Sequence, residues 1–349
     1  MELLSQYGLF LAKVVTIVLA IGALVVLTFG VTQRKRPRKG ELQVMNLGEQ
    51  YREMQNEMRD TCMSDTERKL VAKRKKKEDK AAAKEEKLRA KRGDEKVVKP
   101  RLYVLDFNGS MDAGEVSALR EEVSAVLAVA TPQDEVLLRL ESPGGVVHGY
   151  RLAASQLQRL RDGGIRLTVA VDKVAASGGY MMACVADRIV AAPFAIIGSI
   201  GVVAQIPNFN RLLKNNDIDV ELHTAGEYKR TLTLFGENNT EQGREKFREE
   251  LNVTHGLFKQ FVKEMQPTLD IDKTATGEHW FGTQAQTLGL VDAIGTSDDL
   301  LIQEITTHEV LSVRYTRRKR LLDKIMGNAG DSAERLLLRW WQRGSHPFV

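Results

Sequence analysis

A serine and a lysine are the two residues of this chain best suited to do chemistry together. Ser177 stands between two alanines and two glycines, and Lys229 follows 52 residues later within Gly226–Thr231. A serine hydroxyl becomes a nucleophile when a base removes its proton, and a lysine can be that base only when neutral. Since the ordinary lysine pKa is ~10.4, Lys229 would need an apolar site that a bound peptide covers. The pair would then perform acyl transfer, although each residue alone also fits a turn serine or a surface lysine.

Two glycine-rich turns could hold the oxyanion of such a reaction. The first turn is Ser142–Gly145, with Pro143 fixing the backbone, and the second is Ser177–Gly179. Glycines permit backbone conformations that point an N–H group outward. One N–H from each turn would make an oxyanion hole. Neither turn has the glycine spacing of a phosphate loop or of a dinucleotide-binding loop.

Histidine is the usual partner of a catalytic serine, but no histidine here has an aspartate companion in a motif, and a Gly-x-Ser-x-Gly elbow is absent. Only His148 draws attention, because it follows the first glycine turn. Cys62 and Cys184 are too far apart for a metal motif or a disulfide framework. The proposed acyl transfer needs no metal and no organic cofactor. The six histidines are His148, His223, His255, His279, His308 and His346.

The elements that must position these residues follow an α/β pattern between about residues 100 and 315. Both glycine turns come at the ends of predicted strands, where sites form in parallel sheets. Ser177 would begin an apolar helix that runs through Asp187. We predict strands at 102–107, 136–140, 167–171 and 218–222, and helices at 113–130, 149–161 and 240–264.

The N-terminal segment is long and apolar enough to cross a membrane. Residues 9–31 carry only Lys13 as a charge, and 23 residues at ~1.5 Å each would span ~34 Å. A cleaved signal peptide is the alternative. Apolar residues, however, continue past the small residues at 20–22, and no basic region precedes them. We predict a retained anchor over 1–33. The basic run Arg34–Lys39 favours a cytoplasmic location for the rest of the chain.

Basic segments flank the predicted α/β domain. The net charge of +5 lies mainly before residue 100. Residues 34–99 are expected to be a charged linker, helical or disordered, because apolar positions are too sparse to bury a face. Nucleic-acid binding is not expected, since aromatics do not interleave the lysines; lipid headgroups or simple solvation fit better. Residues 316–349 are predicted as a basic amphipathic helix with Trp340 and Trp341, either on the membrane surface or packed on the domain.

From Arg101 to about Gly295 the sequence resembles the signal peptide peptidase A family of the ClpP/crotonase superfamily. The resemblance rests on four motifs in the family's order: Leu140–Gly145, Val174–Tyr180, Ile197–Val202 and Gly226–Lys229. It implies a ClpP/crotonase-like α/β fold of βαβ units behind one N-terminal transmembrane helix. It also implies these roles: Ser177 as nucleophile, Lys229 as base, Ser199 orienting the lysine, backbone N–H groups of Gly145 and Gly178 as oxyanion hole, and Gly144 and Gly179 as supporting turn residues.

The resemblance further implies a membrane-anchored serine endopeptidase acting on apolar peptides such as signal-peptide remnants or membrane-protein fragments. Its expected place is the bacterial inner membrane. The family favours a periplasmic catalytic domain, whereas Arg34–Lys39 favour the cytoplasm. Larger relatives carry the serine and the lysine in separate tandem copies, so this single copy is expected to share sites between subunits of a homo-oligomer. The alternatives are a catalytically silent membrane scaffold and a crotonase-like acyl-transfer enzyme, which would not need the Ser177–Lys229 pair.

Overall fold

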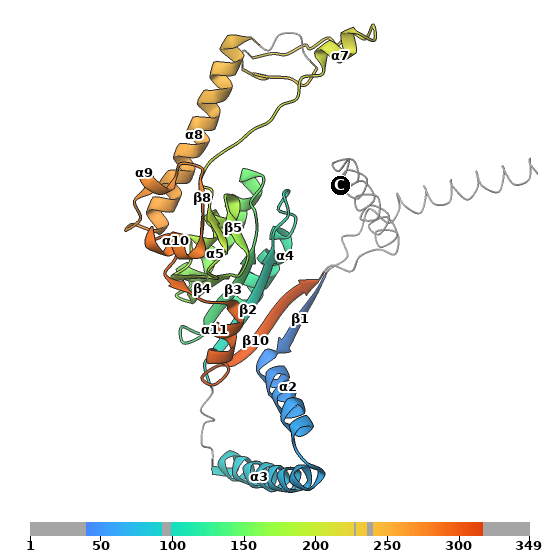
Figure 1. Ribbon diagram of the computed structural model, residues 1–349, viewed down its shortest axis with the longest axis vertical. Coiled ribbons are helices and arrows are strands. Elements are labelled where there is room, and N and C mark those ends of the chain that lie inside the picture. Colours follow the sequence, from blue (N-terminus) through green and yellow to red (C-terminus); the bar gives the residue numbers. More distant parts are fainter. Residues whose placement is uncertain (1–39, 93–98, 227, 236–239, 317–349) are drawn as a thin grey trace, which may run out of the picture. The chain divides into compact units, whose positions relative to one another are not determined.

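The computed structural model describes residues 40–92, 99–226, 228–235 and 240–316 (Figure 1). The predicted membrane anchor and all but the first residue of the predicted C-terminal helix lie outside these ranges. Among the described residues, no helix combines the length and apolar character needed to cross a membrane. The chain divides into two units, and the unit Leu42–Tyr315 contains both glycine turns. The other unit comprises the two terminal segments.

A seven-stranded sheet forms the centre of the Leu42–Tyr315 unit. Its order is β1-β10-β2-β3-β4-β6-β9, and every pairing from β10 to β9 is parallel. The α/β class with a mainly parallel sheet is thereby confirmed. The strands are β1 (Glu41–Asn46), β10 (Glu309–Thr316), β2 (Arg101–Asn108), β3 (Glu135–Glu141), β4 (Arg166–Val171), β6 (Arg188–Ala191) and β9 (Ala293–Ile294).

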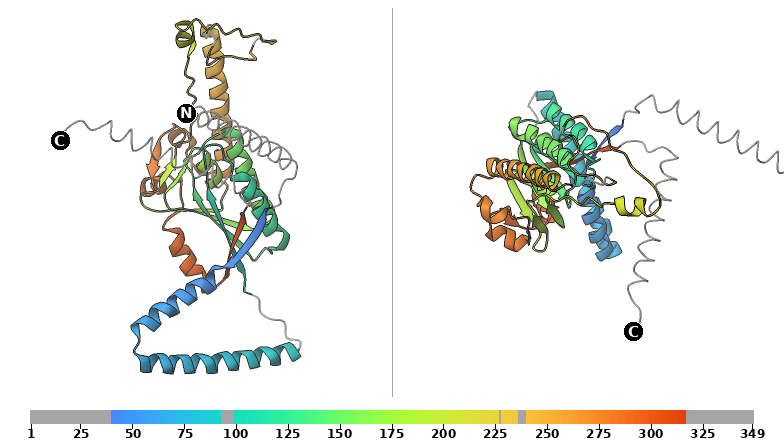
Figure 2. Two further views of the ribbon diagram at one scale, coloured as in Figure 1. Left: turned by 90° about the vertical axis from the view of Figure 1, so that its right-hand side faces the viewer. Right: turned by 90° about the horizontal axis from the view of Figure 1, so that it is seen from above.

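The side chains of the central strands alternate between two hydrophobic clusters. In β2, Tyr103, Leu105 and Phe107 face the larger cluster, whereas Leu102 and Val104 face the smaller one on the opposite face. Because successive side chains of a strand point to opposite faces, this run of buried residues requires cover on both sides. Helices α4 (Val116–Val129) and α5 (Val147–Asp162) lie side by side on the larger cluster (Figures 1 and 2).

A second, three-stranded sheet brings the two glycine turns together. Strand β5 (Val174–Ala176) pairs in parallel with β7 (Ile196–Gly198), and β7 pairs antiparallel with β8 (His279–Phe281). Ser142, directly after β3, forms an isolated parallel bridge with Ala175 of β5. The first glycine turn therefore leaves the large sheet at the point where the second turn leaves the small one.

Most predicted elements agree with the structure, and three differ. The segment 34–99, predicted to be a helical or disordered linker, contains strand β1 of the large sheet, because β1 finds β10 as a partner far along the chain. The strands expected at 102–107, 136–140 and 167–171 and the helices at 113–130, 149–161 and 240–264 correspond to β2, β3, β4, α4, α5 and α8. The helix after Ser177 ends at Ala183 rather than at Asp187, because the chain tightens into turns before β6. The remaining helices are α2 (Leu47–Cys62), α3 (Asp65–Arg92), α6 (Gly178–Ala183), α7 (Asn210–Lys214), α8 (Glu241–Met265), α9 (Ile271–Thr274), α10 (Gly282–Thr287) and α11 (Ser297–Glu304).

The strand predicted at 218–222 was wrong. These residues form no strand, and Ile218, Val220 and Leu222 are all exposed. Their alternating apolar pattern is typical of a strand, but backbone N–H and C=O groups in a strand need a neighbouring strand to bond. Within the described ranges, no strand lies beside this segment to provide those bonds. The alternating pattern of 218–222 therefore predicted the wrong structure, because a strand also needs a neighbouring strand, which a local pattern does not reveal.

Candidate active site

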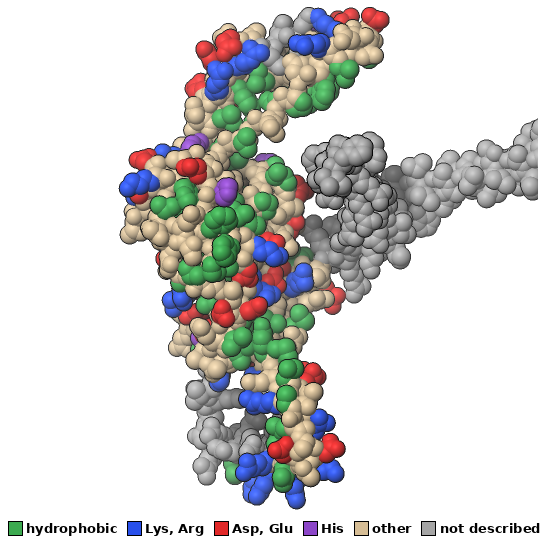
Figure 3. All heavy atoms as spheres, viewed as in Figure 1, with side chains coloured by type: hydrophobic (Ala, Val, Ile, Leu, Met, Phe, Trp, Pro, Cys, Tyr) green, Lys and Arg blue, Asp and Glu red, His purple; other side chains and the backbone are tan. Residues whose placement is uncertain are grey.

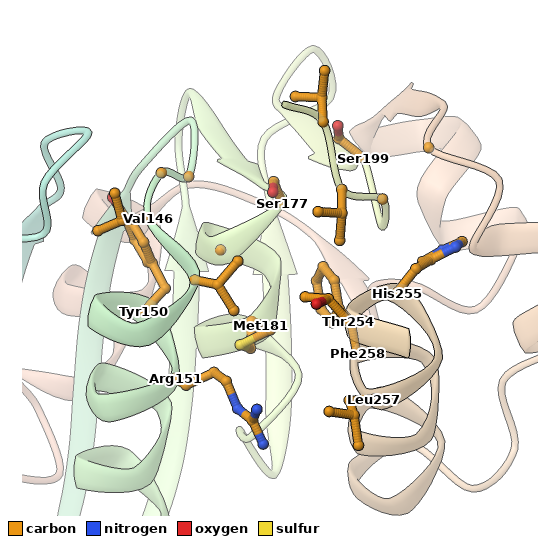
Figure 4. Close-up of a pocket in the computed structure, with 18 of the residues that line it drawn as sticks. Val146, Tyr150, Arg151, Ser177, Met181, Ser199, Thr254, His255, Leu257 and Phe258 are labelled. Carbon is orange, nitrogen blue, oxygen red and sulfur yellow. The ribbon is translucent and has the colours of Figure 1, made fainter. Parts of the chain in front are cut away.

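Ser177 occupies a strained position between β5 and α6. Its backbone angles are φ 51° and ψ −117°, a region that non-glycine residues rarely adopt. Such a conformation costs on the order of 1–3 kcal/mol and persists only where its surroundings enforce it. Here the Ser177 N–H donates to the carbonyl of Gly198 at 2.8 Å, and the Met181 N–H donates to the carbonyl of Ser177 at 3.0 Å. The sharp turn presents the hydroxyl at the end of a pocket (Figure 4).

The two glycine turns are interlocked. Gly144 has φ +88°, and a Cβ atom there would lie 2.8 Å from the carbonyl oxygen of Ala176, the nitrogen of Gly178 and the Cβ of Ser177. A Cβ on Gly179 would collide with the carbonyl oxygen of Ser142. Real Cβ atoms do not approach backbone this closely. Both glycines are therefore required for the turns to touch, and they fix the first turn directly beside Ser177.

Gly145 and Gly178 each have a backbone N–H at this contact without an acceptor in the described part of the chain, and Gly178 is the first residue of α6, where helical N–H groups are free. Gly145 could not carry a side chain, since its Cβ would meet the Met111 carbonyl. By contrast, the Gly144 N–H donates to Ser142 Oγ at 3.1 Å. Unpaired N–H groups beside a candidate nucleophile are suited to bind an oxyanion.

A buried tyrosine, which sequence reasoning missed, supports both turns from below. Tyr150 Oη donates to the Ser110 carbonyl at 2.8 Å and lies 2.6 Å from Ser142 Oγ. Because a phenol has one proton, Ser142 must be the donor in that second bond. The Tyr150 ring also fills the space where a Cβ of Gly178 would stand. Burial raises the pKa of Tyr150, so its hydroxyl stays protonated. A tyrosine five residues after the Ser-Pro-Gly-Gly turn, on the apolar face of the predicted helix 149–161, is the sequence signal that could have identified it.

The pocket at Ser177 has a volume of about 720 Å³ and mainly apolar walls. Helix α8 contributes Thr254, Leu257, Phe258 and Phe261, which lie on one helical face. Met181 of α6 and Val146 at the start of α5 line it as well (Figure 4). A cavity of this size and character suits an extended apolar peptide segment.

Ser199 lies at the same end of the pocket as Ser177 (Figure 4). It also has a left-handed backbone, with φ 51°, and its N–H donates to the Glu278 carbonyl at 2.7 Å. The neighbouring Ile200 carbonyl lies 3.1 Å from Nε2 of His255 on α8. Since a carbonyl only accepts, Nε2 of His255 carries the proton. This bond ties α8 to the Ser199 turn. His255 received no role from the sequence analysis, and its spacing of three residues from Phe258 in the predicted helix 240–264 is the signal that could have identified it.

Lys229 does not line this pocket. It is exposed, in the segment between α7 and α8, and its N–H donates to the Gly226 carbonyl at 3.2 Å. The adjacent Tyr228 ring contacts Lys246 Nζ, 5.4 Å from the ring centroid. Lys246 precedes His255 by nine residues of α8, which corresponds to ~14 Å along the helix axis. The structure thus brings Ser177, Ser199, Gly144, Gly145 and Gly178 together, with Gly179 packed behind them, and leaves Lys229 apart.

Other predicted chemistry groups lie away from the pocket. His148 is exposed in the first turn of α5 and does not line the cavity. Cys184 is fully buried, and burial raises the pKa of its thiol well above the usual range. Among the residues that the structure describes, no cluster of three or more His, Cys, Asp or Glu side chains is placed to hold a metal ion.

Comparison with known proteins identifies proteins that are similar to this chain. A "1510-N membrane-bound stomatin-specific protease" structure covers 67% of this chain and 100% of its own, at 13% identity and a TM-score of 0.42. A "probable protease SohB" of Haemophilus influenzae is 53% identical over 350 residues, 100% of this chain and 99% of that protein. The "probable protease SohB" of Buchnera aphidicola subsp. Acyrthosiphon pisum is 52% identical, over 97% of this chain and 98% of that protein.

Family models match almost the whole chain. The model "Peptidase family S49 N-terminal" matches residues 2–157, and "Peptidase family S49" matches residues 159–325. The second match includes Ser177, Ser199 and Lys229, and the first includes the Ser142–Gly145 turn. These matches confirm the resemblance drawn from the four motifs. The chain belongs to peptidase family S49, among relatives that include the SohB proteases.

Proposed function

We propose that this serine peptidase is a membrane-anchored endopeptidase in which Ser177 is the nucleophile and Lys229 the general base. The observation that carries the proposal is the setting of Ser177. It combines a strained backbone, the N–H groups of Gly145 and Gly178, which have no acceptor among the described residues, and a mainly apolar pocket of about 720 Å³. Enzymes hold strained residues and aimed backbone donors where charge develops in a reaction.

The proposed reaction is acyl transfer in two steps. Neutral Lys229 removes the proton of Ser177 Oγ, and Oγ attacks the peptide carbonyl carbon. The resulting oxyanion is stabilised by the N–H groups of Gly145 and Gly178. The Lys229 ammonium then gives its proton to the leaving amine of the substrate. The Lys229 amine, neutral again, activates water to hydrolyse the acyl-enzyme. In this proposal Ser199, at the same end of the pocket, hydrogen-bonds and orients the incoming Lys229 amine.

The separation of Lys229 from Ser177 supports a site completed by a second subunit. Lys229 belongs to a segment with many exposed apolar side chains, visible around α7 in Figure 3. Exposed apolar patches of this kind mark protein contacts. We therefore propose a ring-like homo-oligomer in which each subunit offers Lys229 to the Ser177 of its neighbour. The exposed residues include Val203, Ile206, Phe209, Leu212, Ile218, Val220, Leu222, Leu234 and Phe235.

The proposed substrates are apolar peptides released at a membrane, such as signal-peptide remnants or fragments of membrane proteins. The apolar pocket walls support this substrate class, and the apolar segment 9–31 supports attachment to the bacterial inner membrane. We propose that the catalytic domain faces the periplasm, against the positive-inside preference of Arg34–Lys39. A reporter fused after Val349 that is active only in the cytoplasm would overturn this orientation.

The catalytic proposal is tested with Ser177→Ala and Lys229→Ala in the full-length chain. Each variant should lose activity on a fluorogenic apolar peptide by at least about 10³-fold, and the double variant should lose no more than either single one. Far-ultraviolet circular dichroism should remain unchanged. A serine-reactive phosphonate should label the wild type and not Ser177→Ala. Cleavage at the wild-type rate by either single variant would overturn the assignment of that residue.

A further inference from the structure

Arg151 is the one arginine, lysine, aspartate or glutamate among the residues that line the Ser177 pocket. It lies on α5 one turn after Val147, so that Val147, Tyr150 and Arg151 share the helical face that forms this wall. Figure 4 shows its side chain extending below Met181, with Leu257 of α8 on the opposite wall. A permanent positive charge therefore stands at the wall of a mainly apolar cavity.

The guanidinium of Arg151 has no hydrogen-bond or ion-pair partner among the described residues, unlike its neighbours on the same helix. Arg159 donates to Gln156 and Ser124, and Arg161 pairs with Asp187 at 3.2 Å. Only the backbone carbonyl of Arg151 is engaged, by the Ser155 hydroxyl. An exposed arginine needs no partner in water. A peptide that fills the pocket would however displace water from Arg151, and an unpaired charge would then be costly.

We propose that Arg151 binds a carboxylate of the peptide substrate, so that the enzyme selects apolar peptides bearing one negative charge at a defined distance from the cleaved bond. This inference rests on the proposed function of Ser177. A guanidinium fork can bind a carboxylate through two parallel N–H···O bonds, and no acidic residue of the pocket competes for it. The carboxylate is either an acidic side chain or the C-terminus of the peptide.

The geometry sets the position of that charge. Ser177 and Met181 are separated by one turn of chain, ~6 Å along the helix axis, and Arg151 extends below Met181. An extended peptide advances ~3.3 Å per residue. The selected carboxylate should therefore lie about two or three residues from the scissile bond.

The test uses full-length enzyme and paired fluorogenic peptides with the same apolar core. In one arm, glutamate and glutamine are compared at each of the three positions on either side of the scissile bond, in peptides with amidated C-termini. In the other arm, peptides without acidic side chains are compared as free acid and amide, with the C-terminus at each of those distances. The wild type should prefer one carboxylate over its neutral counterpart by about 10- to 100-fold in kcat/KM. The arm that shows the preference identifies the source of the charge.

Arg151→Gln should abolish that preference, and Arg151→Glu should reverse it in favour of lysine at the same position. Arg120→Gln, an exposed arginine of α4 outside the pocket, is the matched control and should keep the preference. A wild type without any charge preference, or an Arg151→Gln variant that retains it, would overturn the proposal. Binding of the same peptides to Ser177→Ala, with and without Arg151→Gln, gives the same comparison independently of hydrolysis. Failure of the catalytic assignment would therefore be distinguished from failure of the Arg151 proposal.

Discussion

The hydroxyl groups of Ser142 and Tyr150 lie 2.6 Å apart beneath the two glycine turns. They belong to a directional chain in which the Gly144 N–H donates to Ser142, Ser142 to Tyr150, and Tyr150 to the Ser110 carbonyl. Each group in the chain is satisfied in one orientation only, because each hydroxyl has a single proton. The chain thereby fixes the Pro143–Gly144 peptide, which directly precedes the peptide that carries the N–H of Gly145, a member of the proposed oxyanion hole.

Tyr150→Phe should lower kcat by about 10-fold with little change in KM, since the ring still supports Gly178 but the turn loses its anchor. Steady-state kinetics on the apolar peptide would measure this. Tyr180→Phe is the matched control, because Tyr180 is also fully buried and donates to a backbone carbonyl, that of Leu290, at 3.0 Å. Both variants should lose about 1 kcal/mol of stability. Equal losses of kcat in the two variants would show that Tyr150 acts through general stability alone.

Gly144→Ala should abolish activity and lower the free energy of unfolding by more than about 2 kcal/mol. Its Cβ would force apart the backbone of Ala176 and Gly178 in addition to the strain of φ +88°. Gly164→Ala provides the comparison, because φ is +74° there and the space around it is open. The free energy of unfolding of that variant should fall by only about 1 kcal/mol, and its activity should be retained. Denaturant titration and peptide hydrolysis would measure the two quantities, and similar behaviour of the two variants would contradict the interlocked turns.

Mixing Ser177→Ala and Lys229→Ala subunits should restore part of the activity if neighbouring subunits share sites. Some sites would then combine an intact Ser177 from one subunit with an intact Lys229 from the other. The two variants would be co-expressed with different affinity tags, and mixed oligomers purified through both tags before assay. If every subunit holds its own pair, all sites in the mixture lack one group. Inactive mixed oligomers would refute sharing without refuting the Ser-Lys mechanism.

Glu122→Gln should stabilise the protein at neutral and alkaline pH. Glu122 is buried in α4, and Oε1 accepts the N–H of Tyr315 at 2.7 Å. Burial raises the pKa of Glu122 to about 7, assisted by the charge of Asp106 and opposed by the Tyr315 bond and the charge of Arg314. Because the folded pKa lies above the unfolded value of 4.5, the stability contributed by the protonated acid is complete below pH 4.5 and is lost as pH rises through about 7.

Glutamine keeps the acceptor for Tyr315 and removes the ionisation. At pH 8 the free energy of unfolding of the variant should exceed that of the wild type by at most about 3 kcal/mol, and at pH 5 by much less. Urea unfolding between pH 5 and 8 would measure the difference. Glu121→Gln, on the exposed side of α4, should show no such trend. An unchanged pH dependence in Glu122→Gln would contradict this account.

The sequence predicted the parts of the site that depend on local backbone chemistry. Ser-Pro-Gly-Gly and Ser-Gly-Gly permit unusual φ values, and buried parallel strands appear in a sequence as apolar runs, so the turns at Gly144 and Ser177 and the strand β3 could be predicted. Features that depend on distant partners could not be predicted. The Tyr150 chain joins three segments of the sequence, and His255 reaches Ile200 from 55 residues away. The 218–222 segment has a strand pattern, but no strand of the described ranges lies beside it.

Strand β1 gives a practical rule for cutting this protein into fragments. It lies next to β10 at one end of the large sheet, and Leu47, directly after it, packs on the smaller hydrophobic cluster (Figure 1). A soluble fragment that starts at Pro100 would leave β10 as an open outer strand, ready to pair with another copy and aggregate. A fragment that starts at Gly40 retains the covering strand. A fragment that contains the complete large sheet therefore begins some sixty residues before Pro100, where the α/β sequence pattern starts.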